Sequence, residues 1–208
     1  MSEFIKITWL GHSCFQIEKE GYTVVLDPFE DGYVPGLLPV RAEANLVLCS
    51  HDHKDHGAEW VVGRKPEIPC PFQIETISTY HDDKKGALRG ENTIHILSDG
   101  NVRLAHLGDL GCELSEEDID RLKGVDVLFV PVGGYYTIDA KQAKKTVDQI
   151  QPEITVPMHY RGEGFGFDVL SALDAYTDLC DDAVVYPGNV LELASDKKKQ
   201  TAILQIPR

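Results

Sequence analysis

The densest group of side chains able to do chemistry lies in one short segment, residues 50–57, which reads Ser-His-Asp-His-Lys-Asp-His-Gly. In an extended segment, side chains two residues apart point the same way, so His51 and His53 can reach one ion together. Asp55 and His56, where the chain would turn, can reach a second ion beside it. A polar loop without a function is the alternative, but three histidines in six residues make it the weaker interpretation because only 8 of 208 residues are histidine.

Three further candidate ligands stand at the ends of other predicted strands. His81 ends the strand 73–80, Asp109 follows the strand 102–107, and His159 ends the strand 154–158. Loops that carry functional residues gather at strand ends, so we expect these side chains to meet the histidine-rich segment. Two ions with mostly nitrogen ligands and a shared carboxylate favour zinc, and manganese, iron or nickel remain open.

The elements that would position these residues follow from the apolar pattern. Strands are predicted at Phe4–Leu10, Cys14–Glu18, Tyr22–Leu26, Asn45–Cys49, Gln73–Thr79, Asn92–Leu97, Val102–Leu107, Val125–Val130, Ile154–Met158, Val190–Leu193 and Ala202–Ile206. Helices are predicted from the cap Ser115 to Lys123, from Asp139 to Pro152, and from Asp168 to Leu179. Strands with helices inserted late predict a single α/β (α+β) domain, residues 1–208, with two sheets face to face and helices outside.

Composition excludes several function classes. The net charge of -14, from 20 basic and 34 acidic residues, disfavours long nucleic acids and anionic membranes as partners. No apolar run approaches the roughly 20 residues of a membrane helix, and the first residues do not resemble a secretion signal. Five scattered cysteines without a CxxC pair suit a reducing compartment. We therefore expect a cytoplasmic protein whose partner is a small molecule; a homo-oligomer is neither indicated nor excluded.

The motif and several other blocks resemble a known family. His51, His53, Asp55 and His56 match the HxHxDH motif of the metallo-β-lactamase superfamily. A closer likeness is to bacterial metal-dependent hydrolases related to L-ascorbate-6-phosphate lactonase. It rests on Trp-Leu-Gly-His-Ser at 9–13, Leu-Asp-Pro at 26–28, Ala-His-Leu-Gly-Asp at 105–109, Pro-Val-Gly-Gly-Tyr-Tyr-Thr at 131–137 and Val-Pro-Met-His-Tyr at 156–160. These blocks span about residues 5–161, and they are specific for the fold and metal site but not for the substrate.

The resemblance implies a four-layer αββα sandwich and assigns the ligands to two ions. The first ion would be held by His51, His53 and His81, the second by Asp55, His56 and His159, with Asp109 bridging. The branches that hydrolyse β-lactams typically break the pattern after the motif aspartate or replace the bridging carboxylate by cysteine. This chain keeps His56 and Asp109, so antibiotic hydrolysis is not expected. The chain is also shorter than the ascorbate-phosphate lactonases, so their substrate does not transfer.

The expected chemistry follows from the two ions. Two divalent cations about 3.5–4 Å apart would lower the pKa of a bridging water toward neutrality, and the resulting hydroxide would attack a carbonyl carbon or a phosphorus atom. We expect a small, anionic lactone or ester as substrate, with Asp55 and Asp109 as catalytic residues. Hydrolysis of a small or cyclic phosphodiester is the nearest alternative. A non-catalytic metal-binding protein or an oxygen-reducing di-iron protein is a further one.

The surroundings of the site are indicated less strongly. Asp27 could orient a ligand histidine or simply form a turn before Pro28. His12 could contact substrate or donate a proton, although a structural histidine is favoured. Arg161, with Arg89 behind it, could bind a substrate carboxylate or phosphate, although an exposed loop arginine without a role is favoured for each.

The remaining candidates rest on sequence neighbourhood or on the predicted strands. Tyr160, together with Tyr135 and Tyr136, could form a pocket wall, and residues 162–166 could form a lip over it. Structural roles are favoured for His106, His95 and Cys49.

Overall fold

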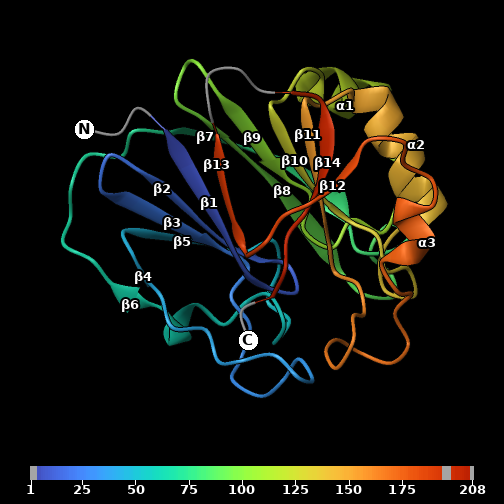
Figure 1. Ribbon diagram of the computed structural model, residues 1–208, viewed down its shortest axis with the longest axis horizontal. Coiled ribbons are helices and arrows are strands. Elements are labelled where there is room, and N and C mark those ends of the chain that lie inside the picture. The colour runs from blue at the N-terminus through green and yellow to red at the C-terminus, as the bar shows by residue number, and fades with distance from the viewer. Residues whose placement is uncertain (1–3, 194–197, 207–208) are drawn as a thin grey trace.

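Two β-sheets pack face to face in the computed structural model, which describes residues 4–193 and 198–206 (Figure 1). The first sheet has five strands in the order β13-β1-β2-β3-β5. They are β1 (Ile5–Gly11), β2 (Cys14–Lys19), β3 (Tyr22–Leu26), β5 (Leu46–Leu48) and β13 (Val190–Leu193). β5 is parallel to β3, with Leu48 opposite Leu26, and the other neighbours are antiparallel.

The second sheet has seven strands in the order β12-β14-β11-β10-β9-β8-β7. They are β7 (Gln73–Tyr80), β8 (Glu91–Ser98), β9 (Arg103–His106), β10 (Val127–Pro131), β11 (Ile154–Met158), β12 (Ala183–Val185) and β14 (Gln200–Ile203). The strands from β9 to β12 in this order are parallel, and β8 is antiparallel to both β7 and β9. β7 therefore runs in the same direction as β9.

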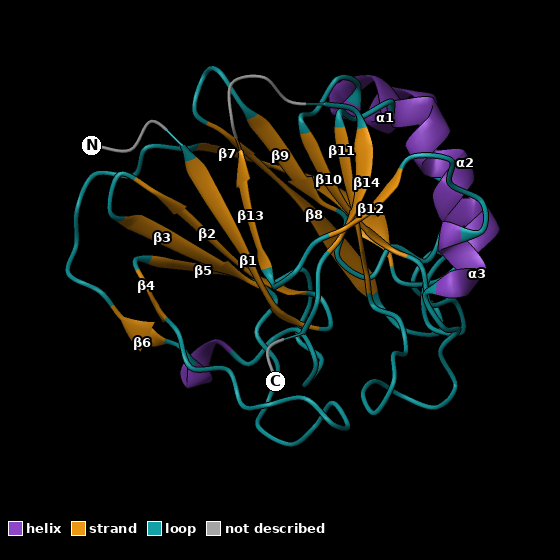
Figure 2. Cartoon of the chain, in the orientation of Figure 1, coloured by secondary structure: helices purple, strands orange, loops and turns teal. Residues whose placement is uncertain are grey.

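The helices cover the outer face of the seven-stranded sheet (Figure 2). They are α1 (Glu116–Leu122), α2 (Ala140–Ile150) and α3 (Asp174–Thr177). α1 and α2 begin at the predicted caps Ser115 and Asp139, each in a capping box. No helix in the described part of the chain is long and apolar enough to cross a membrane.

Irregular chain covers the outer face of the five-stranded sheet. This segment contains the short strands β4 (Glu43–Ala44) and β6 (Gly63–Arg64), which pair with each other, and the 3-10 helix η1 (Glu59–Val61). A small apolar cluster that includes Phe29 and Val40 lies beneath it. The predicted sandwich of two mixed sheets with helices outside is confirmed, with most of its helical residues on one side.

The main core lies between the sheets. Along β1, Ile5, Ile7 and Trp9 are buried whereas Lys6 and Thr8 are partly exposed, which is the alternation of a strand with one face on the core. β10 and β11 are apolar and buried along their whole length. This is typical of parallel strands that are covered on both faces of the sheet. This core fixes the sheets whose ends carry the site.

The predicted helix from Asp168 to Leu179 is wrong for most of its length, since only α3 is helical there. The backbone before α3 is used for other contacts. Ser171 N donates to Gly133 O at 2.8 Å, and Ser171 O accepts from Arg161 N at 3.0 Å. These contacts tie the segment to the loops at the ends of β10 and β11 and leave it unable to form helical hydrogen bonds.

The last strand also differs from the prediction, because β14 covers Gln200–Ile203 instead of Ala202–Ile206. Beyond Ile203 the chain leaves the sheet, and Gln205 N donates to Gly188 O at 3.0 Å. The short strands β4, β6 and β12 were not expected from the pattern.

Strand direction brings the candidate ligands to one edge. β7, β9 and β11 run the same way, so their carboxyl ends lie along the same side of the second sheet. His81, Asp109 and His159 follow these strand ends. β3 and β5 end together, so Asp27 lies beside the histidine-rich segment. Loops gather along the lower edge of both sheets in the view of Figure 2. The two sets of strand ends thus build one site.

Candidate metal centre

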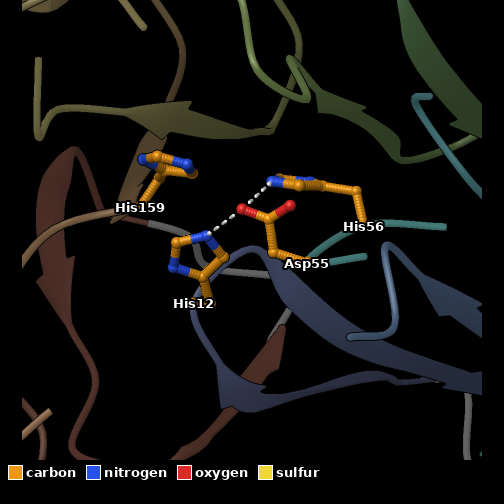
Figure 3. A group of neighbouring side chains, drawn as sticks. All are labelled: His12, Asp55, His56 and His159. Carbon is orange, nitrogen blue, oxygen red and sulfur yellow. Dashed lines mark ion pairs between the residues drawn. The ribbon is translucent and has the colours of Figure 1, made fainter. Parts of the chain in front are cut away.

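The seven predicted ligands, together with His12, form three groups at this edge, and the third shares one histidine with each of the other two. In each group, one potential ligand atom of every residue lies within 4.8 Å of the others. One group contains His51, His53 and His81. A second contains Asp55, His56 and His159 together with His12, which reach the site from three different parts of the chain (Figure 3). A third joins Asp109 to His51 of the first group and to His56 of the second. The three histidines expected at the first ion lie together, and so do the three residues expected at the second, whereas His12 was not expected among the ligands.

Asp109 lies between the two groups. Its Oδ2 is 3.2 Å from His81 Nε2 and 3.2 Å from His159 Nε2, while its Oδ1 is 3.1 Å from His56 Nε2. His51 Nε2 is 4.0 Å from the same carboxylate. One buried carboxylate therefore faces ligand candidates of both groups.

The inward atoms of this cluster suit a cation. His51 Nε2, His56 Nε2, His159 Nε2 and Asp109 Oδ1 are buried and, apart from their close approaches to one another within the cluster, have no hydrogen-bond partner among the residues that the structure describes. A buried polar atom without a partner is costly, by roughly 1–3 kcal/mol. Divalent ions bind neutral imidazole nitrogens and carboxylate oxygens, so the atoms left without partners are the ones a metal needs.

Asp27 and Ser50 fix the orientation of two motif histidines. Asp27 Oδ2 accepts from His56 Nδ1 at 2.8 Å and from Ser50 Oγ at 2.6 Å, and Ser50 Oγ in turn lies 2.9 Å from His51 Nδ1. Ser50 N also donates to Asp27 Oδ1 at 2.7 Å. With both Nδ1 atoms occupied in this way, each imidazole is left with Nε2 for the centre of the cluster.

Asn92 holds the backbone of Asp109 in place, and the sequence analysis did not single this residue out. Its Oδ1 accepts from Asp109 N at 2.8 Å, and its Nδ2 donates to Leu107 O at 3.0 Å and to Thr79 Oγ1 at 2.8 Å. Asn92 is the second residue of β8 and is buried. No signal for this role was present in the sequence, because Glu91 and Thr93 beside Asn92 are polar as well. Ser50, directly before His51, was also missed.

His12 takes part in the cluster instead of lying apart from it. Its Nε2 is 3.5 Å from Asp55 Oδ2, and its ring lies against that of His159, with 4.1 Å between centroids and the planes tilted by 42°. Both ring nitrogens are buried without a hydrogen-bond partner in the described part of the chain. Trp9 Nε1 donates to His12 O at 3.0 Å and holds the loop in place.

Three residues of the site adopt left-handed backbone conformations. They are His12 (φ 52°), Asp27 (φ 45°) and His159 (φ 55°). A non-glycine residue in this region carries strain of roughly 1–3 kcal/mol, which the surrounding structure must offset. Such strain concentrates at functional sites, and here it aims three side chains at one point.

Electrostatics favour the protonation states that bind metal. Burial and neighbouring histidines lower the pKa of His51 to about 3 and that of His12 to about 4. For Asp109, burial opposes ionisation, but the facing His159 and His56 hold its pKa well below the usual value. The cluster thus combines neutral imidazoles with ionised carboxylates.

His56 is the exception within the cluster. Burial lowers its pKa, but the charges of Asp109 and Asp55 raise it well above the usual value. A proton and a divalent cation compete for the same nitrogen, so this histidine holds a proton where a metal would replace it.

A cavity of about 400 Å³ opens above the cluster. Four candidate ligands line it, His53, Asp55, His81 and Asp109, and so does Arg89. The walls also carry Tyr33, Tyr136 and Phe167. The cavity gives a small molecule access to the ligand atoms.

The other residues expected at the pocket lie elsewhere. Arg161 is exposed, and its Nε donates to Leu170 O at 3.1 Å. Tyr160 is buried against Trp9, with ring centroids 5.7 Å apart. Phe165, within the expected lip 162–166, packs on the same two rings. These side chains were expected at the pocket because they are close to His159 in the sequence, but they do not line the cavity.

The residues expected to be structural make ordinary structural contacts. His106 Nε2 donates to Ser13 O at 2.9 Å, and its Nδ1 accepts from Gly108 N. His95 Nε2 lies 3.1 Å from Cys49 O, directly before the motif. Burial raises the pKa of the Cys49 thiol to about 12, so a thiolate is disfavoured there.

Comparison with known proteins identifies the family. Residues 6–159 match the family described as "Beta-lactamase superfamily domain". The UPF0173 metal-dependent hydrolase of Carboxydothermus hydrogenoformans is 28% identical over 195 residues, covering 75% of this chain and 84% of that protein. The UPF0173 protein of Pyrococcus abyssi is 30% identical over 191 residues, covering 78% of this chain and 86% of that protein.

A solved structure agrees with these matches. A Thermotoga maritima protein, described as a candidate zinc-dependent hydrolase of the metallo-β-lactamase superfamily, superposes with a TM-score of 0.79 and 31% identity. The match covers 98% of this chain and 100% of that one. The family match extends over every candidate ligand from His12 to His159. The chain belongs to the metallo-β-lactamase superfamily, among the UPF0173 metal-dependent hydrolases.

Proposed function

We propose that the protein is a dinuclear metal-dependent hydrolase that cleaves a small, anionic lactone or ester. The observation that carries the proposal is the position of Asp109, whose two carboxylate oxygens lie 3.1–3.2 Å from nitrogens of both ligand groups. A carboxylate in this position suits a ligand shared by two ions. The names of the relatives support the hydrolase class.

The residues would divide the work as follows. His51, His53 and His81 hold one ion, Asp55, His56 and His159 hold the other, and Asp109 is shared. When bound, such an ion pair lowers the pKa of water toward neutrality and stabilises negative charge that develops on the substrate. Zinc is the metal we expect from the nitrogen-rich ligand set, with manganese, iron or nickel as alternatives.

Asp55 contributes more than ligation in this proposal. It lines the cavity, and its Oδ2 lies 3.5 Å from His12 Nε2. Burial raises the pKa of Asp55, but the His56 charge and the contact with His12 outweigh burial and hold the pKa below the usual value. Asp55 therefore remains ionised at the cavity wall, where it would accept a hydrogen bond from an incoming water.

The cavity and the charge limit the substrate. A volume of about 400 Å³ suits a small molecule. The net charge of -14 opposes approach of a long polyanion such as a nucleic acid. A lactone or ester with one anionic group fits both observations, as the likeness to lactonase-related hydrolases in the motif blocks also suggests.

The test combines metal analysis with turnover. Protein purified without added metal is analysed by mass spectrometry, and samples loaded with zinc or manganese are assayed on a panel of lactones and aryl esters. Asp109→Ala is expected to lose both bound metal and turnover. The matched control Asp83→Ala, which removes an exposed carboxylate, is expected to change neither. Turnover by Asp109→Ala at the wild-type rate would refute the proposal.

The same samples separate the alternatives. An aryl phosphodiester is assayed beside the lactones. A higher kcat/KM for the phosphodiester than for the lactones would indicate a phosphodiesterase instead of a lactonase or esterase. Native protein that contains iron and reduces oxygen would instead indicate a redox protein. Bound zinc or manganese without any turnover would leave a metal-binding role.

A further inference from the structure

Arg89 is a half-buried cation at the wall of the cavity and has no acidic partner among the described residues. Within the described part of the chain, its guanidinium lies over the ring of Tyr136, with Cζ 5.6 Å from the ring centroid. Lys54, the other cation of the cavity, pairs with Glu30 at 3.2 Å. In a chain with 34 acidic residues against 20 basic ones, an unpaired arginine beside the candidate metal centre is available to a ligand.

The loop that carries Arg89 is anchored directly to the candidate metal centre. Asp82 follows the ligand candidate His81, and its buried carboxylate accepts four backbone N–H groups. Two of these come from Leu88 at 2.9 Å and from Arg89 itself at 2.8 Å. The carboxylate thus holds Arg89 in a fixed relation to His81.

The backbone of this loop is too tightly folded to reposition Arg89 freely. Gly86 has φ +80°, and a Cβ there would lie 2.9 Å from Gly90 O. Lys85 and Gly90 are also left-handed. With the backbone held in this way, only the side chain of Arg89 has to be ordered when a ligand binds, which favours affinity.

The walls beside Arg89 are aromatic. Phe167 contacts Tyr33 and Tyr136, with ring centroids 5.9 Å and 6.3 Å apart. These three rings give the cavity an apolar wall between the rim and the ligand cluster. A planar or apolar group can pack on such a surface, while its polar ends reach the guanidinium and the metal ligands.

We infer that Arg89 binds the oxyanion, a carboxylate or a phosphate, of a substrate whose apolar body lies along Tyr33, Tyr136 and Phe167. The inference rests on the proposed function, because it takes the cavity as the place where substrate binds. A planar guanidinium donates to two oxygens of either anion at once. Arg89 is then the residue that selects anionic over neutral substrates.

Binding measurements test the inference without requiring turnover. Calorimetry on the metal-loaded protein compares phenylacetate and phenylphosphonate with the neutral isostere phenylacetamide. We expect at least one anion to bind more tightly than the amide, and Arg89→Met to weaken that anion by about 10- to 100-fold with little change for the amide. Arg89→Lys should retain part of the preference. The two anions distinguish a carboxylate from a phosphate site.

Arg161→Met is the matched control, since Arg161 is exposed and does not line the cavity. It should bind like the wild type. Thermal unfolding checks that Arg89→Met is folded. Absence of any anion preference in the wild type, or retention of the preference in Arg89→Met, would overturn the inference. A preference that depends on Arg89 in a protein that hydrolyses nothing would leave the inference standing and refute the proposed function.

Discussion

Asp27 and His56 form a completely buried pair, with 2.8 Å between Oδ2 and Nδ1. Burial by itself raises the pKa of Asp27. The charges of His106 and His56 and the hydrogen bonds from His56 and Ser50 outweigh burial, and the pKa is lowered to about 2. Through Ser50, the same carboxylate also reaches His51. One residue outside the ligand set therefore sets the orientation of two ligand candidates.

Asp27→Asn should weaken metal binding while leaving every ligand in place. An amide presents one oxygen where the carboxylate presents two, so it cannot satisfy His56 Nδ1, Ser50 N and Ser50 Oγ together. Loss of such an orienting partner typically costs 10- to 100-fold in metal affinity. Competition with a chromophoric chelator measures the change. Asp31→Asn, at an exposed position that pairs with Arg41, is the control. Equal affinities in the two variants would contradict the role given to Asp27.

His12→Ala should remove one of the two proposed ions preferentially. His12 contacts both Asp55 and the ring of His159, which are in the second ligand group, and belongs to no group with His51, His53 or His81. Its loss leaves a void beside those two side chains, so we expect the metal content after dialysis to fall from two ions per chain toward one. The ion held by the other group is the internal control. Retention of two ions at wild-type affinity would leave His12 with a packing role only.

The ligand positions could be predicted because local spacing and strand direction both determine them. Two residues of an extended segment share a face, which relates His51 to His53. Parallel strands end at one edge, which relates Asp109 to His159. The spacing can be read from the sequence, whereas the directions of these strands come from the structure, and the sequence supported only the expectation that functional loops gather at strand ends.

The supporting residues depend on register and packing, which the sequence does not show. Asn92 reaches Asp109 N only because β8 and β9 pair in one particular register. Arg161 follows His159 and Tyr160 along the chain, yet its bond to Leu170 O turns it away, whereas Arg89 reaches the cavity from a loop far away in sequence. The helix expected to begin at Asp168 failed for the same reason, because long-range backbone bonds replaced helical ones.

Gly133→Ala should disturb the candidate metal centre through the backbone. A Cβ on Gly133 would lie 2.1 Å from His159 O, so the main chain that carries His159 must shift. We expect a loss of about 1–3 kcal/mol in the free energy of unfolding and weaker binding of one ion. Gly188→Ala is the matched control because no heavy atom lies within 4 Å of the Cβ that it adds. Urea denaturation and metal titration measure both variants. Similar behaviour of the two would show that His159 tolerates the shift.

Asp99→Asn should destabilise the fold at neutral pH, independently of the metal centre. Asp99 lies in the turn between β8 and β9 and pairs with Lys19 at the end of β2, so it joins the two sheets. Burial raises its pKa, but the Lys19 contact and the N–H groups of Val102 and Asn101 lower it below the usual value. An aspartate with a lowered folded-state pKa stabilises the fold above its unfolded pKa, and that contribution is lost as the pH falls through the folded value.

The pH dependence therefore distinguishes this ion pair from simple packing. Wild type and Asp99→Asn should differ by about 1–3 kcal/mol in the free energy of unfolding at pH 7. The difference should shrink as the pH falls below about 4, where an unperturbed aspartate takes up its proton. Urea denaturation of the metal-free proteins measures it, since loss of metal at low pH would otherwise mask the effect. Asp83→Asn, which removes an exposed partner of Lys84, should show no such difference. A deficit of equal size at every pH would mean that the asparagine disturbs the turn itself, because only the charge of Asp99 can make the deficit disappear in acid.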